Sequence, residues 1–259
     1  IPAMLSKNKI KFINSIKKKK TRDELKYFFV EGEKLVDELI LSNAKILEIF
    51  ATEEWIEKNK DKSSDLLNII TTVTEKELNQ ISALATPNKV FAVLPFLEYT
   101  FSKAEILNEL SILLDQINDP GNLGTIIRIA DWFGIKNIFC SLNSVDLYNP
   151  KVVQATMGAI FRVKVHYVDF STFLGDYKKI DDFDIYGTFL EGNNIYQEKL
   201  NSKGFIMMGS ESHGISIQWE PYIGKKLFIP SYPAGIPTSE SLNISVATAI
   251  TCSEFRRRI

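Results

Sequence analysis

The residues best suited to chemistry gather in three segments, and the first is 115–124, Asp-Gln-Ile-Asn-Asp-Pro-Gly-Asn-Leu-Gly. Pro120 and Gly121 predict a turn that leads into a helix. Free N–H groups at a helix start can hold an anion such as a phosphate. Arg128, four residues beyond Gly124, adds positive charge close to this loop. A capping turn with a surface arginine is the alternative, and the missing third glycine argues against a dinucleotide fingerprint.

The second segment, 208–215, places a carboxylate between two glycines just past a predicted strand. Glu211 is that carboxylate, and a solvated loop acid is its alternative interpretation. His213 follows two residues later. Taken alone, we interpret it as a surface or packing residue and not as a base.

The third segment, 229–247, contains Ser241, Asn243 and Ser245, which are unusual polar choices beside an apolar stripe. A helix is predicted over about 239–257, with Ser239 as its N-cap. Capping accounts for only one polar side chain of this run, so the others are candidates for a site. The predicted buried stripe of the helix is Leu242, Val246, Ala249 and Ile250.

The elements that must position these segments alternate between strand and helix. Strands are predicted at 112–114, 137–140, 163–168, 184–189, 205–208 and 227–229, and helices at 125–132, 150–158, 171–179, 215–223 and 239–257. This order predicts an α/β fold, with a mostly parallel sheet and helices on both faces. Ligands bind outside the carboxyl ends of strands in such sheets, where the three segments lie.

The first part of the chain is predicted to be a separate small α/β domain over 4–95. Its predicted strands are 27–30, 46–50, 69–70 and 90–94, and its predicted helices are 7–20, one opened by Glu31-Gly32, 53–60 and 75–82. A less regular stretch, 96–110, is predicted to be the linker to a second domain over 111–259.

Charge is concentrated near the N-terminus although the formal net charge is −1. Between Lys7 and Lys26, nine basic residues stand against two acidic ones. This cluster predicts phosphate contacts with nucleic acid, and a solvated basic helix face is the alternative. The residues that we predict to bind RNA are Lys7, Lys17, Lys18, Lys19, Lys20 and Arg22.

Composition narrows the class of protein further. Two cysteines without a CxxC spacing and two histidines predict reduced thiols and no metal site. The sequence contains no run of eighteen apolar residues, so no membrane span is predicted, and the N-terminus shows no signal-peptide pattern. We therefore expect a cytoplasmic protein.

The three segments together resemble the motifs of the SpoU (TrmH-like) RNA 2′-O-ribose methyltransferases of the SPOUT superfamily. Asp119-Pro120-Gly121-Asn122-Leu123-Gly124 with Arg128 resembles the first motif, Gly209-Ser210-Glu211 with Gly214 the second, and Ser241-Leu242-Asn243-Ile244-Ser245-Val246-Ala247 the third. The resemblance covers about 110–258. The first domain is similar to the ribosomal-protein-like substrate-binding module often attached to these enzymes, notably at Phe29-Val30-Glu31-Gly32.

The resemblance implies a C-terminal trefoil knot, a homodimer whose active site draws on both subunits, and transfer of a methyl group from S-adenosylmethionine (SAM) to a ribose 2′-hydroxyl. The implied SAM contacts are Gly209, Ile229 and Leu242, with Thr188 at a strand end as a fourth. The implied catalytic residues are Asn122, Arg128, Glu211, Ser241 and Asn243. Because a guanidinium does not release its proton near neutral pH, we expect Arg128 to be an electrostatic clamp, and the proton acceptor is left open.

Ribosomal RNA is the expected substrate, because the enzymes acting on tRNA often lack a separate N-terminal module. The same chemistry on tRNA and a catalytically silent RNA-binding protein are the alternatives, and a nicotinamide-dependent oxidoreductase ranks below them. Three features depart from the family pattern: Ser210 stands where many members have Asn, Ser212-His213 replace small or basic residues, and the loop from Ser231 to Glu240 is longer than expected. The sequence does not name the target nucleotide or separate a housekeeping from a resistance role.

Overall fold

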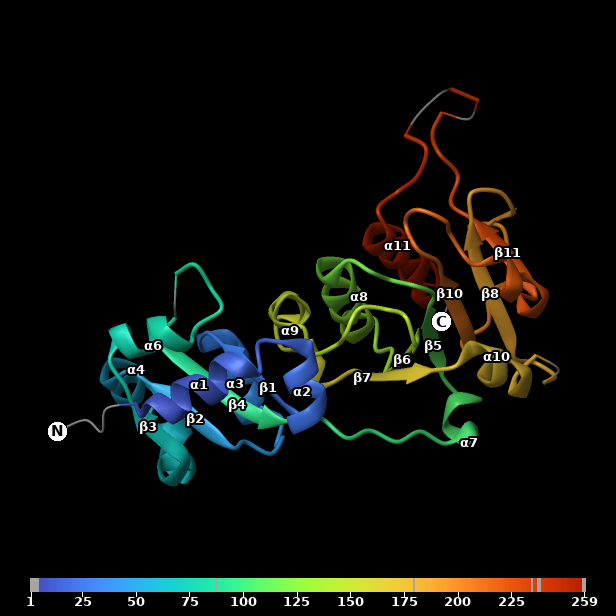
Figure 1. Cartoon of the computed structure of the whole chain (residues 1–259). Helices are drawn as coiled ribbons and strands as arrows, with labels where there is room; N and C mark the ends of the chain where they lie inside the picture. The colour runs from blue at the N-terminus through green and yellow to red at the C-terminus, as the bar shows by residue number, and fades with distance from the viewer. Residues whose placement is uncertain (1–4, 87, 179, 234, 237–238, 258–259) are drawn as a thin grey trace. The chain divides into compact units, whose positions relative to one another are not determined.

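The computed structural model describes residues 5–86, 88–178, 180–233, 235–236 and 239–257 (Figure 1). The chain forms two compact units, one of residues 1–98 with 146–161 and one of 99–145 with 162–259. The boundaries predicted from the sequence, 4–95, 96–110 and 111–259, stay a prediction. The sequence did not indicate that 146–161 packs with the first unit.

The first unit is built around a four-stranded sheet in the order β1-β4-β2-β3, in which only the β2–β3 pair is parallel. Its elements are α1 (Lys7–Ser15), α2 (Lys19–Leu25), β1 (Tyr27–Glu31), α3 (Glu33–Leu41), β2 (Glu48–Ala51), α4 (Glu53–Lys58), α5 (Lys60–Ser63), η1 (Ser64–Ile69), β3 (Ile70–Thr72), α6 (Glu75–Ile81), β4 (Val90–Pro95), α9 (Pro150–Thr156) and η2 (Ala159–Phe161). The four predicted strands are confirmed. The Phe29 and Phe91 rings stack in the core with centroids 4.9 Å apart.

The single basic helix predicted over 7–20 is wrong, because two helices replace it. The first ends at Ser15, and Lys18 precedes the second with extended backbone. The guanidinium of Arg22 donates to the carbonyls of Ile16 and Lys17, at 3.1 and 2.6 Å. The break is therefore stabilised by a side chain that satisfies carbonyls left free where the first helix ends.

The second unit contains a seven-stranded sheet in the order β7-β6-β5-β10-β8-β11-β9, and every pairing in it is parallel. Its elements are α7 (Lys103–Ile106), β5 (Leu110–Leu114), α8 (Pro120–Trp132), β6 (Asn137–Ser141), β7 (Lys164–Val168), α10 (Phe170–Phe173), η3 (Leu174–Asp176), β8 (Asp184–Phe189), β9 (Asn193–Asn194), β10 (Gly204–Met208), η4 (Ile217–Tyr222), β11 (Lys225–Phe228) and α11 (Ile244–Arg257). The predicted parallel α/β sheet is confirmed. The two-residue strand β9 was not predicted.

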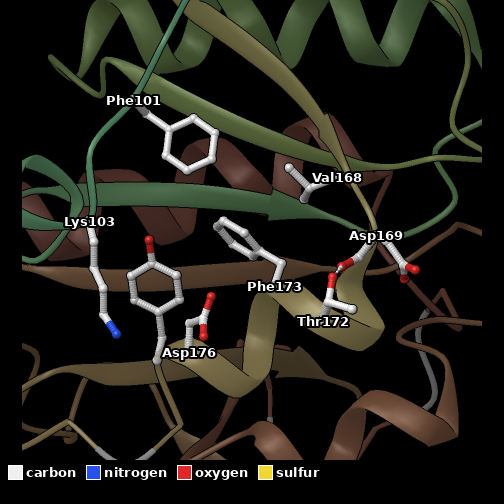
Figure 2. Close-up of a pocket in the computed structure, with 8 residues that line it drawn as sticks. Phe101, Lys103, Val168, Asp169, Thr172, Phe173 and Asp176 are labelled. Atoms are coloured by element: carbon white, nitrogen blue, oxygen red, sulfur yellow. Dashed lines mark hydrogen bonds between the residues drawn. The ribbon is translucent and has the colours of Figure 1, made fainter.

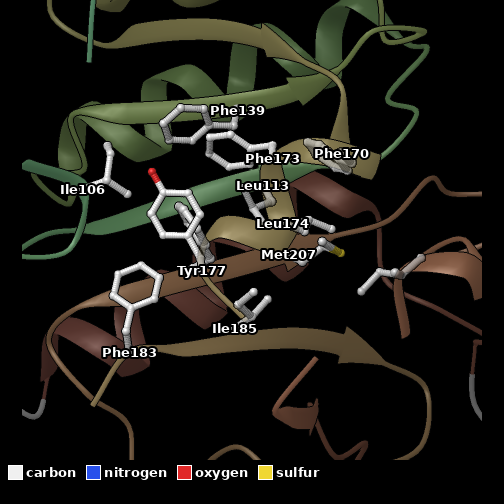
Figure 3. Packing of buried hydrophobic residues seen from close by; sticks show 12 residues of the cluster. Ile106, Leu113, Phe139, Phe170, Phe173, Leu174, Tyr177, Phe183, Ile185 and Met207 are labelled. Carbon is white, nitrogen blue, oxygen red and sulfur yellow. The ribbon is translucent and has the colours of Figure 1, made fainter. Parts of the chain in front are cut away.

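Helices cover both faces of this sheet, as predicted. One face packs against α10 and η3 in an aromatic-rich cluster, shown in Figure 3, that includes Leu113, Phe139, Phe170, Phe173, Leu174, Tyr177, Ile185, Phe205 and Met207. Tyr186 follows Ile185 on β8 and therefore faces the other side. There its ring meets Phe255 of α11 edge to face, with centroids 4.9 Å apart.

Helices α8 and α11 lie side by side (Figure 1), and contacts at both of their ends show that they run in the same direction. Near their starts, the Ser245 hydroxyl of α11 donates to the Asn122 Oδ1 of α8 at 3.0 Å. At their ends, the guanidinium of Arg256 donates to the carbonyls of Phe133 and Gly134 at 2.7 and 3.2 Å. The pair therefore brings the first and third motifs to one place.

The predicted start of α8 at Thr125 is wrong, because the helix begins five residues earlier. Asp119 is its N-cap, and its Oδ1 accepts a hydrogen bond from the Asn122 N–H at 2.8 Å. Pro120 and Gly121 belong to the first turn of the helix and not to a preceding turn. Proline is favoured at the first position of a helix, because a backbone N–H at that position has no partner within the helix and proline lacks this group.

The predicted start of α11 is wrong as well. The helix begins at Ile244, and Asn243 caps it by accepting the Ser245 N–H at 2.9 Å, so Ser239 is not the N-cap. The predicted buried stripe is also wrong, since Leu242 and Val246 are 48% and 47% exposed. The helices predicted over 171–179 and 215–223 are short, with 3₁₀ turns at η3 and η4.

Candidate functional site

Three of the predicted catalytic residues form one hydrogen-bonded cluster, which we call the amide–carboxylate cluster: Asn122, Glu211 and Asn243. The Nδ2 groups of both asparagines donate to the Glu211 Oε1, at 2.5 Å from Asn122 and 3.0 Å from Asn243. The Asn243 Nδ2 also lies 3.1 Å from the Asn122 Oδ1. One residue from each motif thus meets in a fixed arrangement that can orient a polar substrate group.

Ser245 completes this cluster and was not among the predicted catalytic residues. Its hydroxyl donates to the Asn122 Oδ1, and its N–H donates to the Asn243 Oδ1. The residue is only 5% exposed. The sequence signal was the run of polar residues in the third motif, of which capping explains one. Ser245 therefore holds both asparagines in position.

The loop carrying Glu211 is closed by backbone contacts that require a glycine at its base. Ser210 and Gly214 exchange two backbone hydrogen bonds, of 3.0 and 2.8 Å. A Cβ on Gly209 would lie 2.0 Å from the backbone of Gly214 and Ile215. Gly209 is therefore needed for the close passage of the chain, whatever else it contacts.

Asp115, at the end of β5, anchors the segment that leaves this loop, and sequence reasoning missed this role. Its buried carboxylate accepts the Ser216 N–H at 2.8 Å and the Trp219 Nε1–H at 3.3 Å. The next residue, Gln116, has a left-handed backbone with φ of 57° and donates from Nε2 to the Ser216 Oγ. A non-glycine residue with this conformation is uncommon, and the contacts to Ser216 hold Gln116 beside the loop that carries Glu211.

A cavity of about 110 Å³ opens beside the cluster. It is lined by Gln116, Ile117, Asn118, Asp119, Asn122, Ser210, Glu211, Ser212 and Ile244. The lining combines the first and second motifs with the start of α11. The cavity is the place in this unit where a reacting group can meet the amide–carboxylate cluster.

Two predicted catalytic residues, Arg128 and Ser241, are not brought into the cluster. Both are exposed, and within the described parts of the chain neither side chain makes a hydrogen bond or ion pair. Arg128 lies six residues after Asn122 on α8, so their side chains point about 120° apart around the helix axis. The expectation that Arg128 lies close to the loop is wrong, because α8 starts at Pro120.

Three of the four predicted SAM contacts lie at the carboxyl ends of neighbouring strands, and the fourth, Leu242, lies just before α11. Thr188 is on β8, paired with Leu227 of β11, so that Thr188, Gly209 and Ile229 share one edge of the sheet. Gly209 presents bare backbone, Ile229 is half-buried and Leu242 is half-exposed. Backbone groups beside apolar surface suit a ligand with an adenine ring and polar ends, so these residues fit SAM.

The basic residues near the N-terminus divide into two sets. Lys7, Lys18, Lys19 and Lys20 are exposed. Lys17 donates from Nζ to the Ser82 carbonyl at 2.8 Å, and burial lowers its pKa despite the nearby carboxylate of Glu31.

The geometry does not support the predicted phosphate contact of Arg22. The residue is 2% exposed, and its Nη2 lies 2.6 Å from the Asp146 Oδ2. Nη1 is already bonded to the carbonyls that close the break between α1 and α2. Arg22 is therefore not presented to RNA, and removing its partner would leave an uncompensated buried charge in the first unit.

A larger cavity, of about 370 Å³, lies beside α10 (Figure 2). Phe101, Phe173 and Tyr177 supply aromatic rings, and Asp169, Thr172 and Asp176 supply polar groups. None of the predicted site residues lines this cavity, so the site is assigned to the smaller one. Among the described residues, no group of three or more His, Cys, Asp or Glu side chains could hold a metal ion. No described helix is long and apolar enough to span a membrane.

The sheet and the amide–carboxylate cluster define a class of protein. It is a parallel α/β protein with its candidate site beyond the carboxyl ends of the strands, where such sheets bind ligands. Residues 109–253 match the family model described as the SpoU rRNA Methylase family. Residues 7–92 match the MRM3-like substrate binding domain.

Relatives resemble the chain over nearly its whole length. The 23S rRNA (guanosine(2553)-2′-O)-methyltransferase RlmP of Bacillus subtilis is 29% identical over 251 residues, 96% of each protein. A TrmH-family structure from Porphyromonas gingivalis is 34% identical with a TM-score of 0.86, covering 99% of this chain and 100% of that one. The AdoMet-bound rRNA methyltransferase of Sinorhizobium meliloti is 26% identical with a TM-score of 0.84, covering 100% and 97%. The chain belongs to the SpoU rRNA methylase family and is a SAM-dependent RNA methyltransferase, which confirms the resemblance of the three motifs.

Proposed function

We propose that this protein transfers the methyl group of SAM to a ribose 2′-hydroxyl of ribosomal RNA. The observation that carries the proposal is the amide–carboxylate cluster, which joins all three motifs at the carboxyl edge of the parallel sheet. The MRM3-like match over the first unit and the rRNA-modifying relative of similar length favour ribosomal RNA over tRNA. The intact cluster favours an enzyme over a silent RNA-binding protein.

The side chains of the site position groups and do not need to activate them strongly. SAM supplies a methyl group that its sulfonium already activates. Gly209, Ile229 and Leu242, with Thr188, would hold it. Glu211, fixed by Asn122 and Asn243, orients the ribose, and Ser241 contributes from the start of the third motif. Fixed orientation of this kind supplies several kcal/mol of a reaction barrier.

A homodimer accounts for the position of Arg128. The side chain is exposed and points away from Asn122, so a second copy of this chain is the proposed source of the arginine at each cluster. Exposed apolar side chains on and beside the α8–α11 pair support such an interface: Trp132 of α8 is 85% exposed, and Val246 of α11 and Leu242, which precedes α11, are about half exposed. Burying them against a symmetric copy removes apolar surface from water.

We also propose the family's trefoil knot and a cytoplasmic location. The segment after β11 returns to contact the loop after β10, since Asn243 bonds Glu211. The close passage at Gly209 agrees with a crowded crossing of chain segments. Two buried free thiols agree with a reducing compartment.

Transfer of labelled methyl from SAM to unmodified ribosomal RNA and to tRNA, followed by alkaline hydrolysis, tests the reaction. A 2′-O-methyl blocks cleavage, so label in alkali-resistant dinucleotides from ribosomal RNA is expected. Label in mononucleotides would show base methylation and end the proposal, and label only in tRNA would select the alternative substrate. Glu211→Gln should lose most activity while still binding SAM by calorimetry.

The same assay tests the shared active site. Arg128→Ala and Glu211→Gln, each nearly inactive alone, are unfolded together, refolded and assayed as a mixture. If each site takes Arg128 from one subunit and Glu211 from the other, half of the dimers carry one intact site, and about a quarter of wild-type activity returns. A mixture as inactive as its parts, in a protein that light scattering shows to be dimeric, would place both residues in one subunit's site.

A further inference from the structure

A serine that lines the reaction cavity forms a hydrogen-bonded pair with the histidine that follows it in the chain. The Ser212 Oγ lies 2.7 Å from the His213 Nδ1, and Ser212 lines the cavity together with Asn122 and Glu211. We call these two residues the Ser212–His213 pair. Both are exposed, so the pair is open to solvent and to RNA.

The loop that carries Glu211 also fixes this pair. The His213 N–H donates to the Ser210 Oγ at 3.3 Å, and the two backbone bonds between Ser210 and Gly214 close the loop around it. The pair therefore shares its backbone framework with the cluster that orients the ribose. A framework shared in this way holds two groups at a constant separation.

The other groups near the cavity are poorly suited to accept a proton. Arg128 is a guanidinium, which remains protonated near neutral pH. Asp119 and Glu211 are the titratable side chains in the cavity lining, and each already accepts hydrogen bonds: Asp119 from the Asn122 N–H, Glu211 from two side-chain amides. Carboxylates are also weaker bases than imidazole by about two pKa units. The second histidine, His166, is buried in the core.

We propose that the Ser212–His213 pair accepts the proton that the ribose 2′-hydroxyl loses on methylation. The inference rests on the proposed 2′-O transfer and names its proton acceptor. The imidazole holds its own hydrogen on Nε2, so that the Ser212 O–H donates to Nδ1. As the 2′-oxygen takes the methyl group, its O–H bond breaks and the proton passes to the Ser212 Oγ, while the serine proton passes to Nδ1. The positive charge lost from the sulfonium reappears on the imidazolium, so charge and protons balance.

The rate of methyl transfer under saturating SAM and RNA tests the proposal. His213→Gln keeps a hydrogen-bonding side chain without a basic nitrogen, and we expect kcat to fall about 100-fold or more, the usual share of a proton-transfer group. The pH profile of kcat, measured for the wild type and for His213→Gln, should differ between the two proteins. Ser212→Ala should lower kcat by a similar factor, while Ser212→Thr, which keeps the hydroxyl, should retain activity. Ser202→Ala, in an exposed loop away from the cavity, should not change kcat.

Two measurements separate proton acceptance from a structural role. Free imidazole added to His213→Ala should restore part of the activity, which a purely structural histidine would not allow. Because the chain has two histidines and one is buried, nitrogen NMR can assign the His213 ring. The neutral ring should carry its hydrogen on Nε2 in the wild type.

Each outcome decides a different claim. If the wild type is active and His213→Gln has the same kcat, the proton-acceptor role is overturned. A neutral His213 ring that carries its hydrogen on Nδ1 would also overturn it. Either result would leave the 2′-O transfer intact. If the wild type itself places no label in alkali-resistant dinucleotides, the 2′-O transfer fails first.

Discussion

His166 shows how burial of one side chain makes stability depend on pH. Its Nε2 lies 3.0 Å from the Asn137 Oδ1, and its ring stacks on Phe139. Burial, assisted by the positive charge of Lys164, lowers the pKa of His166 to about 4, against a partly opposing effect of Glu105. In the unfolded chain a histidine titrates near about 6.5. Between these values only the unfolded state takes up the proton, so folding is weakened as the pH falls from about 6.5 to about 4.

We expect the free energy of unfolding to fall by up to about 3 kcal/mol across that interval because of this residue. Denaturant unfolding of the wild type and of His166→Phe at several pH values measures the effect. The phenylalanine keeps the stacked ring and removes the titration, so its stability should depend less on pH, even if the lost bond to Asn137 lowers the overall value. Parallel pH curves for the two proteins would contradict the assignment.

At the scale of elements, the sequence predicts strands better than helix ends. Every strand of three or more residues was predicted. In the parallel sheet of the second unit the reason is that buried parallel strands, such as β5 and β10, are continuous apolar runs. The starts of α8 and α11 were missed because Pro120-Gly121 also fits a turn, and because Ser239 fits a cap as well as Asn243 does. In α11, Thr248 and Thr251 are buried, and their hydroxyls donate to backbone carbonyls one turn back in the helix. Hydrophobic periodicity does not predict buried polar residues of this kind.

The loop after β10 gives a prediction at the same scale. Gly209→Ala forces a methyl group against the backbone of Gly214 and Ile215, so the loop must shift and displace Glu211. We expect a loss of about 1–3 kcal/mol in unfolding free energy, typical of overpacking, together with weak SAM binding and low methyl transfer. Gly175→Ala is the matched control, because a Cβ there meets no atom within 4 Å. Equal stability and SAM affinity in the two variants would show that the loop tolerates the added methyl.

At the scale of the whole molecule, contacts between distant segments are what the sequence did not reveal. Residues 146–161 pack in the first unit although they lie in the sequence between strands of the second. Tyr148 stacks on Phe96 with centroids 3.9 Å apart, and Arg22 pairs with Asp146. Local sequence patterns carry no information about such partners. Arg22 was therefore predicted to contact RNA on the basis of the basic residues beside it in the sequence.

The exposed lysines of the first unit support the last prediction. Changing Lys18, Lys19 and Lys20 to glutamine removes three exposed charges that have no ion pair among the described residues. By contrast, Lys58, Lys60 and Lys62 pair with Glu33, Glu57 and Asp37. Phosphate contacts release counterions, so the first variant should bind ribosomal RNA more weakly, with a salt slope lower by about two to three. A control variant, in which Lys58, Lys60 and Lys62 are changed to glutamine, has the same net charge as the first variant and should keep the wild-type slope. Equal slopes in the two variants, measured by filter binding across a salt series, would mean that RNA responds only to net charge and that Lys18–Lys20 form a solvated face.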